Sequence, residues 1–144
     1  MQQNLNFIKK FWPIGLILIT AFVLRVYKIQ ELFYFSFDES IPAFVGKNLH
    51  QIGKLPLVGG VTPFGVHLPP YFYWLLANII GVSNLDPIAW GYAGAFFSLF
   101  TILLIYIVGK EFFSRQIGFY AAILWSFSFL ANVYDRHFWA LFWG

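Results

Sequence analysis

Long apolar stretches alternate with short polar ones along this chain, and the pattern predicts helices that lie in or on a membrane. Four apolar stretches stand out, namely Phe11–Tyr27, Leu68–Leu85, Pro87–Gly109 and Ile117–Tyr134. The last two contain no Asp, Glu, Lys or Arg and are long enough to cross a bilayer as helices. The first is about 17 residues, or roughly 25 Å of helix. It spans if Arg25 and Lys28 extend their charged ends to the interface.

The second stretch is interrupted by polar residues and does not have the length of a span. It begins with Pro69-Pro70 and also contains Asn78, Gly81 and Asn84. Its strongly apolar part is about ten residues long, which is too short to cross the hydrocarbon core. We therefore expect a helix that lies along the membrane surface.

Cationic residues at the ends of the stretches predict the orientation. The cytoplasmic side is predicted to hold Lys9, Lys10, Lys110 and Arg115, because Lys and Arg accumulate in cytoplasmic loops. The first helix then runs outward, the third stretch inward and the fourth outward, with the N-terminus in the cytoplasm. Arg25 and Lys28, at the opposite end of the first helix, count against this orientation.

These features predict an all-α, multi-pass protein of the plasma membrane with about three transmembrane helices. The predicted spans are residues 11–28, 87–109 and 117–134. Residues 29–86 form one long external loop with two juxtamembrane helices. The first of these is "ESIPAFVGKNLHQIG", which ends at Gly53; the second follows Pro70.

The two ends of the chain add further expectations. No small-x-small cleavage site follows the first apolar stretch, so we expect an uncleaved anchor helix rather than a signal peptide. The last residues, "HFWALFWG", stop inside a new apolar run. We therefore expect the chain to be the N-terminal part of a larger polytopic fold.

Composition agrees with a membrane location and excludes several function classes. Of the 144 residues, 60% are hydrophobic and only 10% are charged, and a chain this short has too little interior to hide so much apolar surface. The net charge of +3 comes from scattered cations and does not indicate a nucleic-acid partner. The chain has no cysteine, which excludes disulfides, thiol catalysis and thiolate metal sites.

The stretch "FYFSFDESIPAF" places Asp38 and Glu39 among aromatic residues of the predicted external loop. A carboxylate that is partly desolvated at the membrane surface becomes a better base. The alternative is a helix start, with Asp38 as N-cap and Glu39 favouring the helix dipole in the first turn.

Two further residues carry candidate chemistry. His67 precedes the Pro-Pro pair and would bind a lipid headgroup or a metal; the alternative is a solvated loop histidine. Arg136, in "YDRH", would pair with a phosphate, or serve as an interfacial anchor. His50 and His67 have no metal-ligand spacing with the carboxylates, so no metal site is predicted. No nucleotide-binding loop or nucleophile elbow is present.

The order of several motifs resembles the N-terminal module of the GT-C glycosyltransferases. The motifs are "LRVYKI", "FDES", "GKNLHQIGKLP", "GVHLPPYFYWLLA", "YIVGKEFFSRQIGFYAAIL" and "YDRHFWA". The chain is similar to the branch that contains the protein O-mannosyltransferases, the lipid A aminoarabinose transferase and the relatives of the rhizobial lipopolysaccharide galacturonosyltransferases. The resemblance covers essentially the whole chain.

The resemblance implies transfer of a hexosyl or pentosyl group from a polyprenyl-phosphate donor on the outer face of the membrane. The acceptor is a glycan, a lipid or a protein of the cell envelope. The Asp of the family's Asp-Glu motif lies at the catalytic centre and matches Asp38, which Glu39 follows. His67 corresponds to the residue near the lipid phosphate.

The resemblance is weaker at the end of the chain. Arg136 and Trp139 fit the family's Arg motif, but Ala140 and Leu141 replace its polar or Pro positions. Family members have many more helices, so this chain corresponds to a fragment that is not expected to be active alone.

Two function classes are therefore weighed. The first is a membrane glycosyltransferase with Asp38 as general base, whose partners are the lipid-linked donor, the acceptor and membrane lipids. The second is a non-enzymatic scaffold or a small transporter subunit, which should place ionisable residues or broken helices at mid-membrane. The uncharged spans and the polar external loop favour the first. No cofactor is predicted, and a divalent metal is the remaining alternative.

Overall fold

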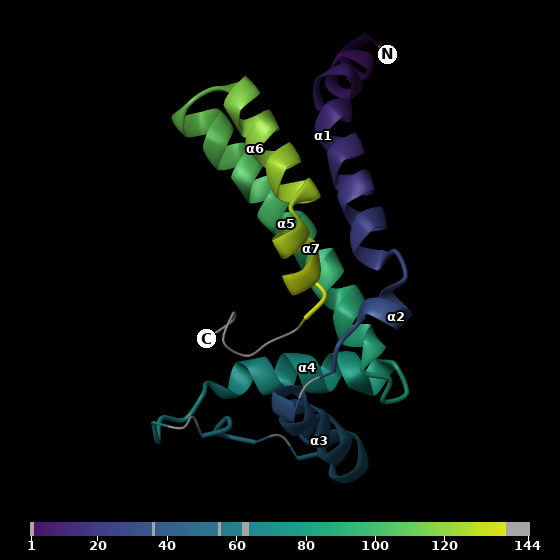
Figure 1. The fold of residues 1–144 in the computed structure, drawn as a ribbon, viewed down its shortest axis with the longest axis vertical. Helices are drawn as coiled ribbons and strands as arrows, with labels where there is room; N and C mark the ends of the chain where they lie inside the picture. Colours follow the sequence, from purple (N-terminus) through teal and green to yellow (C-terminus); the bar gives the residue numbers. More distant parts are fainter. Residues whose placement is uncertain (1, 36, 55, 62–63, 138–144) are drawn as a thin grey trace. The chain divides into compact units, whose positions relative to one another are not determined.

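The computed structural model describes residues 2–35, 37–54, 56–61 and 64–137, with the backbone alone described for residues 2–11, 37 and 38. The helices are α1 Gln2–Val26, α2 Ile29–Leu32, α3 Phe37–Ile52, α4 Pro70–Val82, α5 Ile88–Phe112, α6 Arg115–Phe127 and α7 Phe129–Tyr134 (Figure 1). In these ranges the only β-type pairing is an isolated antiparallel bridge between Val61 and His67. The prediction of an all-α chain is confirmed.

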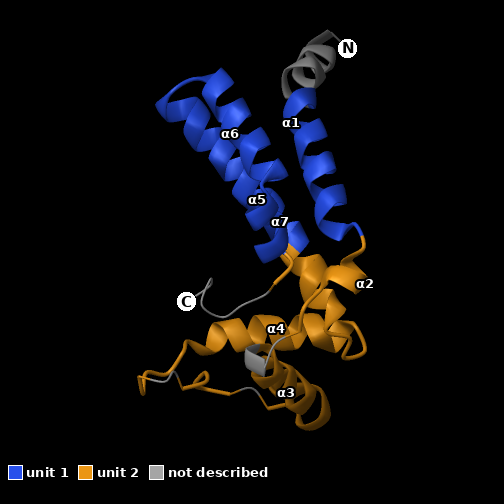
Figure 2. Ribbon diagram, in the orientation of Figure 1, with its two compact units in different colours: residues 1–27, 95–135 blue, residues 28–94, 136–144 orange. Residues whose placement is uncertain are grey.

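The chain divides into two compact units, and α5 contributes to both (Figure 2). Unit 1 consists of Met1–Tyr27 and Ala95–Asp135. Unit 2 consists of Lys28–Gly94 and Arg136–Gly144.

Unit 1 is built from α1, most of α5, α6 and α7. Its buried core is formed by Ile14, Ile17, Ala21, Ile102, Tyr106 and Ala122. Helices α5 and α6 form an antiparallel pair (Figure 1), and their backbones approach closely where two glycines face each other. A Cβ atom on Gly109 would lie 2.6 Å from the Cα atom of Gly118, so this contact admits no side chain. Ser114 is the N-cap of α6, and its Oγ accepts a hydrogen bond from the backbone N–H of Ile117 at 3.2 Å.

Unit 2 packs α3 against α4, again through a glycine. A Cβ atom on Gly46 of α3 would lie 3.2 Å from the Cα atom of Ala77 in α4. Helix α3 ends before Gly53, whose φ of +71° is a left-handed conformation that glycine adopts at low cost. Helix α4 begins at Pro70, because proline suits the first helical position. Both helices predicted for residues 29–86 are therefore confirmed as helices.

Among the described residues, α5 is the one helix long and apolar enough to cross a membrane. It has 25 residues, and its most apolar window has a mean hydropathy of 2.0. The apolar part of α1 is shorter, Trp12–Val26. Helix α4 has 13 residues, which agrees with the expectation that it is too short to span.

The predicted single helix over residues 117–134 is wrong, because the chain leaves helical geometry at Ser128. The backbone of Ser128 is extended, with φ −61° and ψ 123°, and it separates α6 from α7. The Ser128 side chain then accepts a hydrogen bond from the N–H of Ala131 at 3.4 Å and caps α7. Serine stabilises such a helix start by replacing a missing backbone acceptor.

Candidate functional site

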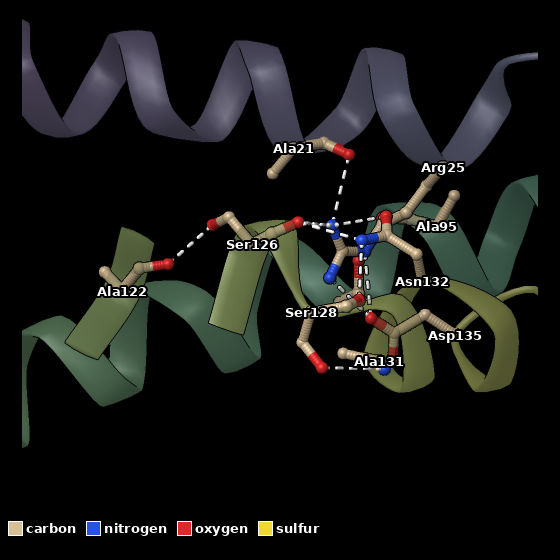
Figure 3. A network of polar contacts seen from close by, with 10 residues as sticks. Ala21, Arg25, Ala95, Ala122, Ser126, Ser128, Ala131, Asn132 and Asp135 are labelled. Atoms are coloured by element: carbon tan, nitrogen blue, oxygen red, sulfur yellow. Dashed lines mark hydrogen bonds and ion pairs between the residues drawn. The ribbon is translucent and has the colours of Figure 1, made fainter. Parts of the chain in front are cut away.

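A buried arginine organises the polar interior of unit 1 (Figure 3). Arg25 lies in the last turn of α1 and is fully buried. Its Nε donates a hydrogen bond to Oδ2 of Asp135 at 2.8 Å, and its Nη2 lies 2.7 Å from the same oxygen. The guanidinium is thus paired with a carboxylate that follows α7, 110 residues further along the chain.

The rest of this network fills the break between α6 and α7 (Figure 3). Nη1 of Arg25 donates to the carbonyl oxygen of Ser126 at 3.4 Å and to Oδ1 of Asn132 at 3.3 Å. The Asn132 amide donates in turn to the carbonyl oxygens of Ser126 and Ser128, at 2.9 and 2.8 Å. Carbonyl groups at a helix break are costly to bury without hydrogen-bond donors. Here Arg25 and Asn132 supply those donors.

Arg25 was expected to extend its charge to the interface, and that expectation is wrong. The guanidinium turns inward because Asp135 and the carbonyls of the broken helix together offer it a charged and hydrogen-bonded environment. Burial raises the pKa of Asp135, while the hydrogen bond and the charge of Arg25 act in the opposite direction. Lys28 does remain exposed, in an ion pair with Glu31 at 3.0 Å.

Unit 2 brings Glu39 next to His137, although the two are far apart in the sequence. Glu39 lies in the first turn of α3 and is only 3% exposed. Its Oε1 is 3.9 Å from Nδ1 of His137. The imidazole stacks on Phe33, with ring centroids 6.5 Å apart, and meets Tyr34 edge-on at 5.9 Å. A carboxylate in this position lies near enough to the ring to favour one of its orientations.

Asp38 is the second residue of α3, and its side chain lies outside the described part of the chain. Since α3 begins at Phe37, Asp38 lies within the first helical turn. An N-cap residue precedes the helix, so the N-cap interpretation of Asp38 does not fit these bounds. The dipole interpretation of Glu39 does fit its place in the first turn.

Arg136 and His137 are neighbours in the chain, and both belong to unit 2. Arg136 is largely buried, at 9% exposure. Sequence reasoning considered Arg136 but missed His137, for which the only signal was its place in "YDRH". The predicted Trp139 position, with Ala140 and Leu141, lies outside the described residues.

His67 occupies the irregular segment between α3 and α4. It is exposed, and its Nδ1 lies 3.4 Å from the carbonyl oxygen of Gly59. Two backbone hydrogen bonds hold this region together, from Gly59 N to Leu68 O at 3.0 Å and from Leu68 N to Gly60 O at 2.8 Å.

An apolar cavity of about 300 Å³ lies between α3 and α4, and its lining includes Ser40, which follows Glu39 in the sequence. Its walls are formed by Phe35, Ser40, Ala43, Phe44, Lys47, Ile80 and Leu85. Lys47 is the single cation among them. A cavity of this composition suits a ligand with an apolar body and one anionic group.

The described residues contain no group of three or more His, Asp or Glu side chains placed to hold a metal ion. Comparison of the chain with models of protein families, with curated proteins and with solved structures finds no match.

Proposed function

We propose that the chain is the N-terminal module of a GT-C-type glycosyltransferase of the plasma membrane. It would transfer a sugar from a polyprenyl-phosphate donor to a glycan, lipid or protein acceptor on the outer face. The observation that carries this proposal is the Asp38-Glu39 pair in the first turn of α3, with Glu39 buried against His137. Buried carboxylates with a charged or titratable partner concentrate at functional sites.

In the proposed reaction Asp38 acts as general base. The acceptor hydroxyl oxygen forms a bond to the anomeric carbon, and its proton passes to the Asp38 carboxylate. The bond between the anomeric carbon and the phosphate oxygen breaks, and its electron pair leaves with the lipid phosphate. The Glu39–His137 pair fixes the start of α3 and thereby the position of Asp38.

The donor lipid is proposed to lie along the cavity between α3 and α4. The prenyl chain would contact the apolar walls at Phe35 and Phe44, and the phosphate would approach Lys47. His67 is proposed as a second phosphate ligand from the segment that precedes α4. An ammonium or imidazolium next to the phosphate stabilises the negative charge that develops on the leaving group.

The proposed membrane arrangement has three crossings, formed by α1, by α5 and by α6 with α7, and a cytoplasmic N-terminus. Exposed apolar side chains support it. On α1 they recur at helical spacing as Trp12, Leu16, Ile19 and Val23. A contiguous exposed apolar surface of this kind is usually covered, either by membrane lipid or by another protein.

Cysteine labelling tests this topology in a chain that has no cysteine of its own. Single cysteines at Gln51 and Gln116 are expected to react from opposite faces of sealed vesicles, because α5 separates them with one crossing. The measurement is labelling by a membrane-impermeant maleimide before and after permeabilisation. Reaction of both positions from the same face contradicts the three-crossing arrangement.

A binding experiment tests the proposed role of His67. In the full-length protein, His67→Ala is expected to raise the donor concentration needed for half-maximal transfer several-fold, while the rate at saturating donor changes less. His50→Ala is the matched control, since His50 lies in the last turn of α3 and is also exposed. If the two variants show the same donor dependence, His67 is an ordinary loop histidine.

One observation favours the alternative of a transporter subunit. The helix break at Ser128, with Arg25 and Asp135 beside it, is the kind of polar, broken-helix feature that transporters use. However, the polar groups there bond to one another, and both charges lie at helix ends rather than at helix centres. The glycosyltransferase is therefore the function that the site supports best.

A further inference from the structure

We propose that unit 1 binds the phosphate group of an anionic phospholipid in a pocket at the α5–α6 turn. This inference rests on the membrane arrangement of the proposed function but not on sugar transfer. The pocket has a volume of about 350 Å³ and is formed by α1, α5 and the first turns of α6. It is separate from the cavity of unit 2, with which it shares no lining residue.

The polar part of the pocket suits a phosphate. Arg115 and Gln116 line it from the start of α6, and Tyr106 and Tyr120 line it from α5 and α6. A guanidinium presents several N–H donors in a plane that matches phosphate oxygens. The amide of Gln116 and the two phenols can donate further hydrogen bonds.

The remaining walls are apolar and suit the hydrocarbon of a lipid. Ile14 of α1 and Phe119 of α6 form part of them. Tyr120 also begins an exposed apolar stripe on α6 that continues at helical spacing with Leu124 and Phe127. An acyl chain that leaves the pocket along this stripe would remain in contact with apolar side chains. In the proposed membrane arrangement this stripe faces the bilayer, so the acyl chain would join the surrounding lipid.

Charge and depth agree with this occupant. Among the described residues that line the pocket, Arg115 is the one cation. Lys110 and Glu111 are its neighbours in sequence and form an ion pair with each other. If α5 spans the bilayer, its end at Phe112 places Arg115 at the level of the lipid headgroups. The orientation proposed above makes this the cytoplasmic leaflet, whose anionic lipids attract cations.

Native mass spectrometry of the purified full-length protein in neutral detergent tests the site. The wild type is expected to bind phosphatidylglycerol at one site at least tenfold more tightly than phosphatidylcholine. Arg115→Gln is expected to abolish this preference. Gln116→Glu brings a negative charge to the same pocket and is also expected to abolish the preference. It replaces Arg115→Gln in the test if that variant does not fold.

Lys110→Gln is the matched control, because it removes a cation from the same turn but not from the pocket. It is expected to retain the preference. Equal loss in Lys110→Gln would show diffuse surface charge and overturn the proposal, as would equal binding of the two lipids. Competition by glycerol phosphate at similar concentration would identify a soluble-phosphate site instead. The binding measurement contains no sugar donor, so absence of the lipid preference can be distinguished from absence of sugar transfer.

Discussion

Replacement of Asp38 by Asn in the full-length protein is expected to lower the rate of sugar transfer by about a hundredfold to ten-thousandfold. Asn keeps the shape of the side chain but cannot accept the proton of the acceptor hydroxyl. The rate is measured at saturating polyprenyl-phosphate donor, so that weaker donor binding does not contribute. The loss should appear in the transfer step, with donor binding nearly unchanged.

Glu39→Gln is the matched control for Asp38→Asn, because it makes the same change from carboxylate to amide at the next residue. Its expected effect on transfer is smaller, since Glu39 lies 3.9 Å from His137 and its proposed role is to position the start of α3. If Asp38 merely interacts with the helix dipole, Asp38→Asn costs about 0.3–1 kcal/mol of stability and leaves transfer nearly normal. Near-normal transfer would therefore remove Asp38 from the catalytic role.

Arg25→Leu is expected to destabilise unit 1 by about 1.5 to 3 kcal/mol, the usual cost of losing hydrogen bonds to a charged group, because the Asp135 side chain is 22% exposed. The substitution leaves the Asp135 carboxylate without its cation and removes a donor from the carbonyl of Ser126. The measurement is the free energy of unfolding in detergent, followed by tryptophan fluorescence. The double variant Arg25→Leu/Asp135→Leu should recover much of the loss, because an apolar pair can replace a buried ion pair.

Lys28→Leu provides the comparison for Arg25→Leu, since Lys28 also lies near the end of α1 but forms an exposed pair with Glu31. Exposed pairs contribute about 0–1 kcal/mol, so this variant should unfold close to the wild type. If Arg25→Leu costs no more than Lys28→Leu, the buried network does not hold α1 to α7.

Local sequence signals predicted the elements whose ends are set by nearby residues. Helix α3 stops at Gly53, which takes up a left-handed conformation. Helix α4 starts at Pro70, and α5 follows an uninterrupted apolar run. In each case the residue types at the boundary carry the reason for the boundary.

The features that sequence reasoning missed depend on contacts between distant parts of the chain. Nothing in the uncharged run 117–134 marks Ser128 as a break, because serine is also tolerated within helices. The break becomes favourable once Asn132 and Arg25 supply donors to its carbonyl oxygens. Likewise, the burial of Glu39 depends on a fold that brings His137 beside it.

The central claim is tested most directly by the content of lipid-linked sugars in the source cells, a measurement that works whichever sugar and acceptor the enzyme uses. Polyprenyl-phosphate sugars are quantified by mass spectrometry in cells that lack the full-length gene, and in the same cells complemented with wild-type protein or with Asp38→Asn. We predict that one such sugar accumulates in the deletion, falls with the wild type and stays high with Asp38→Asn. An unchanged set of lipid-linked sugars in all three would contradict the proposed function.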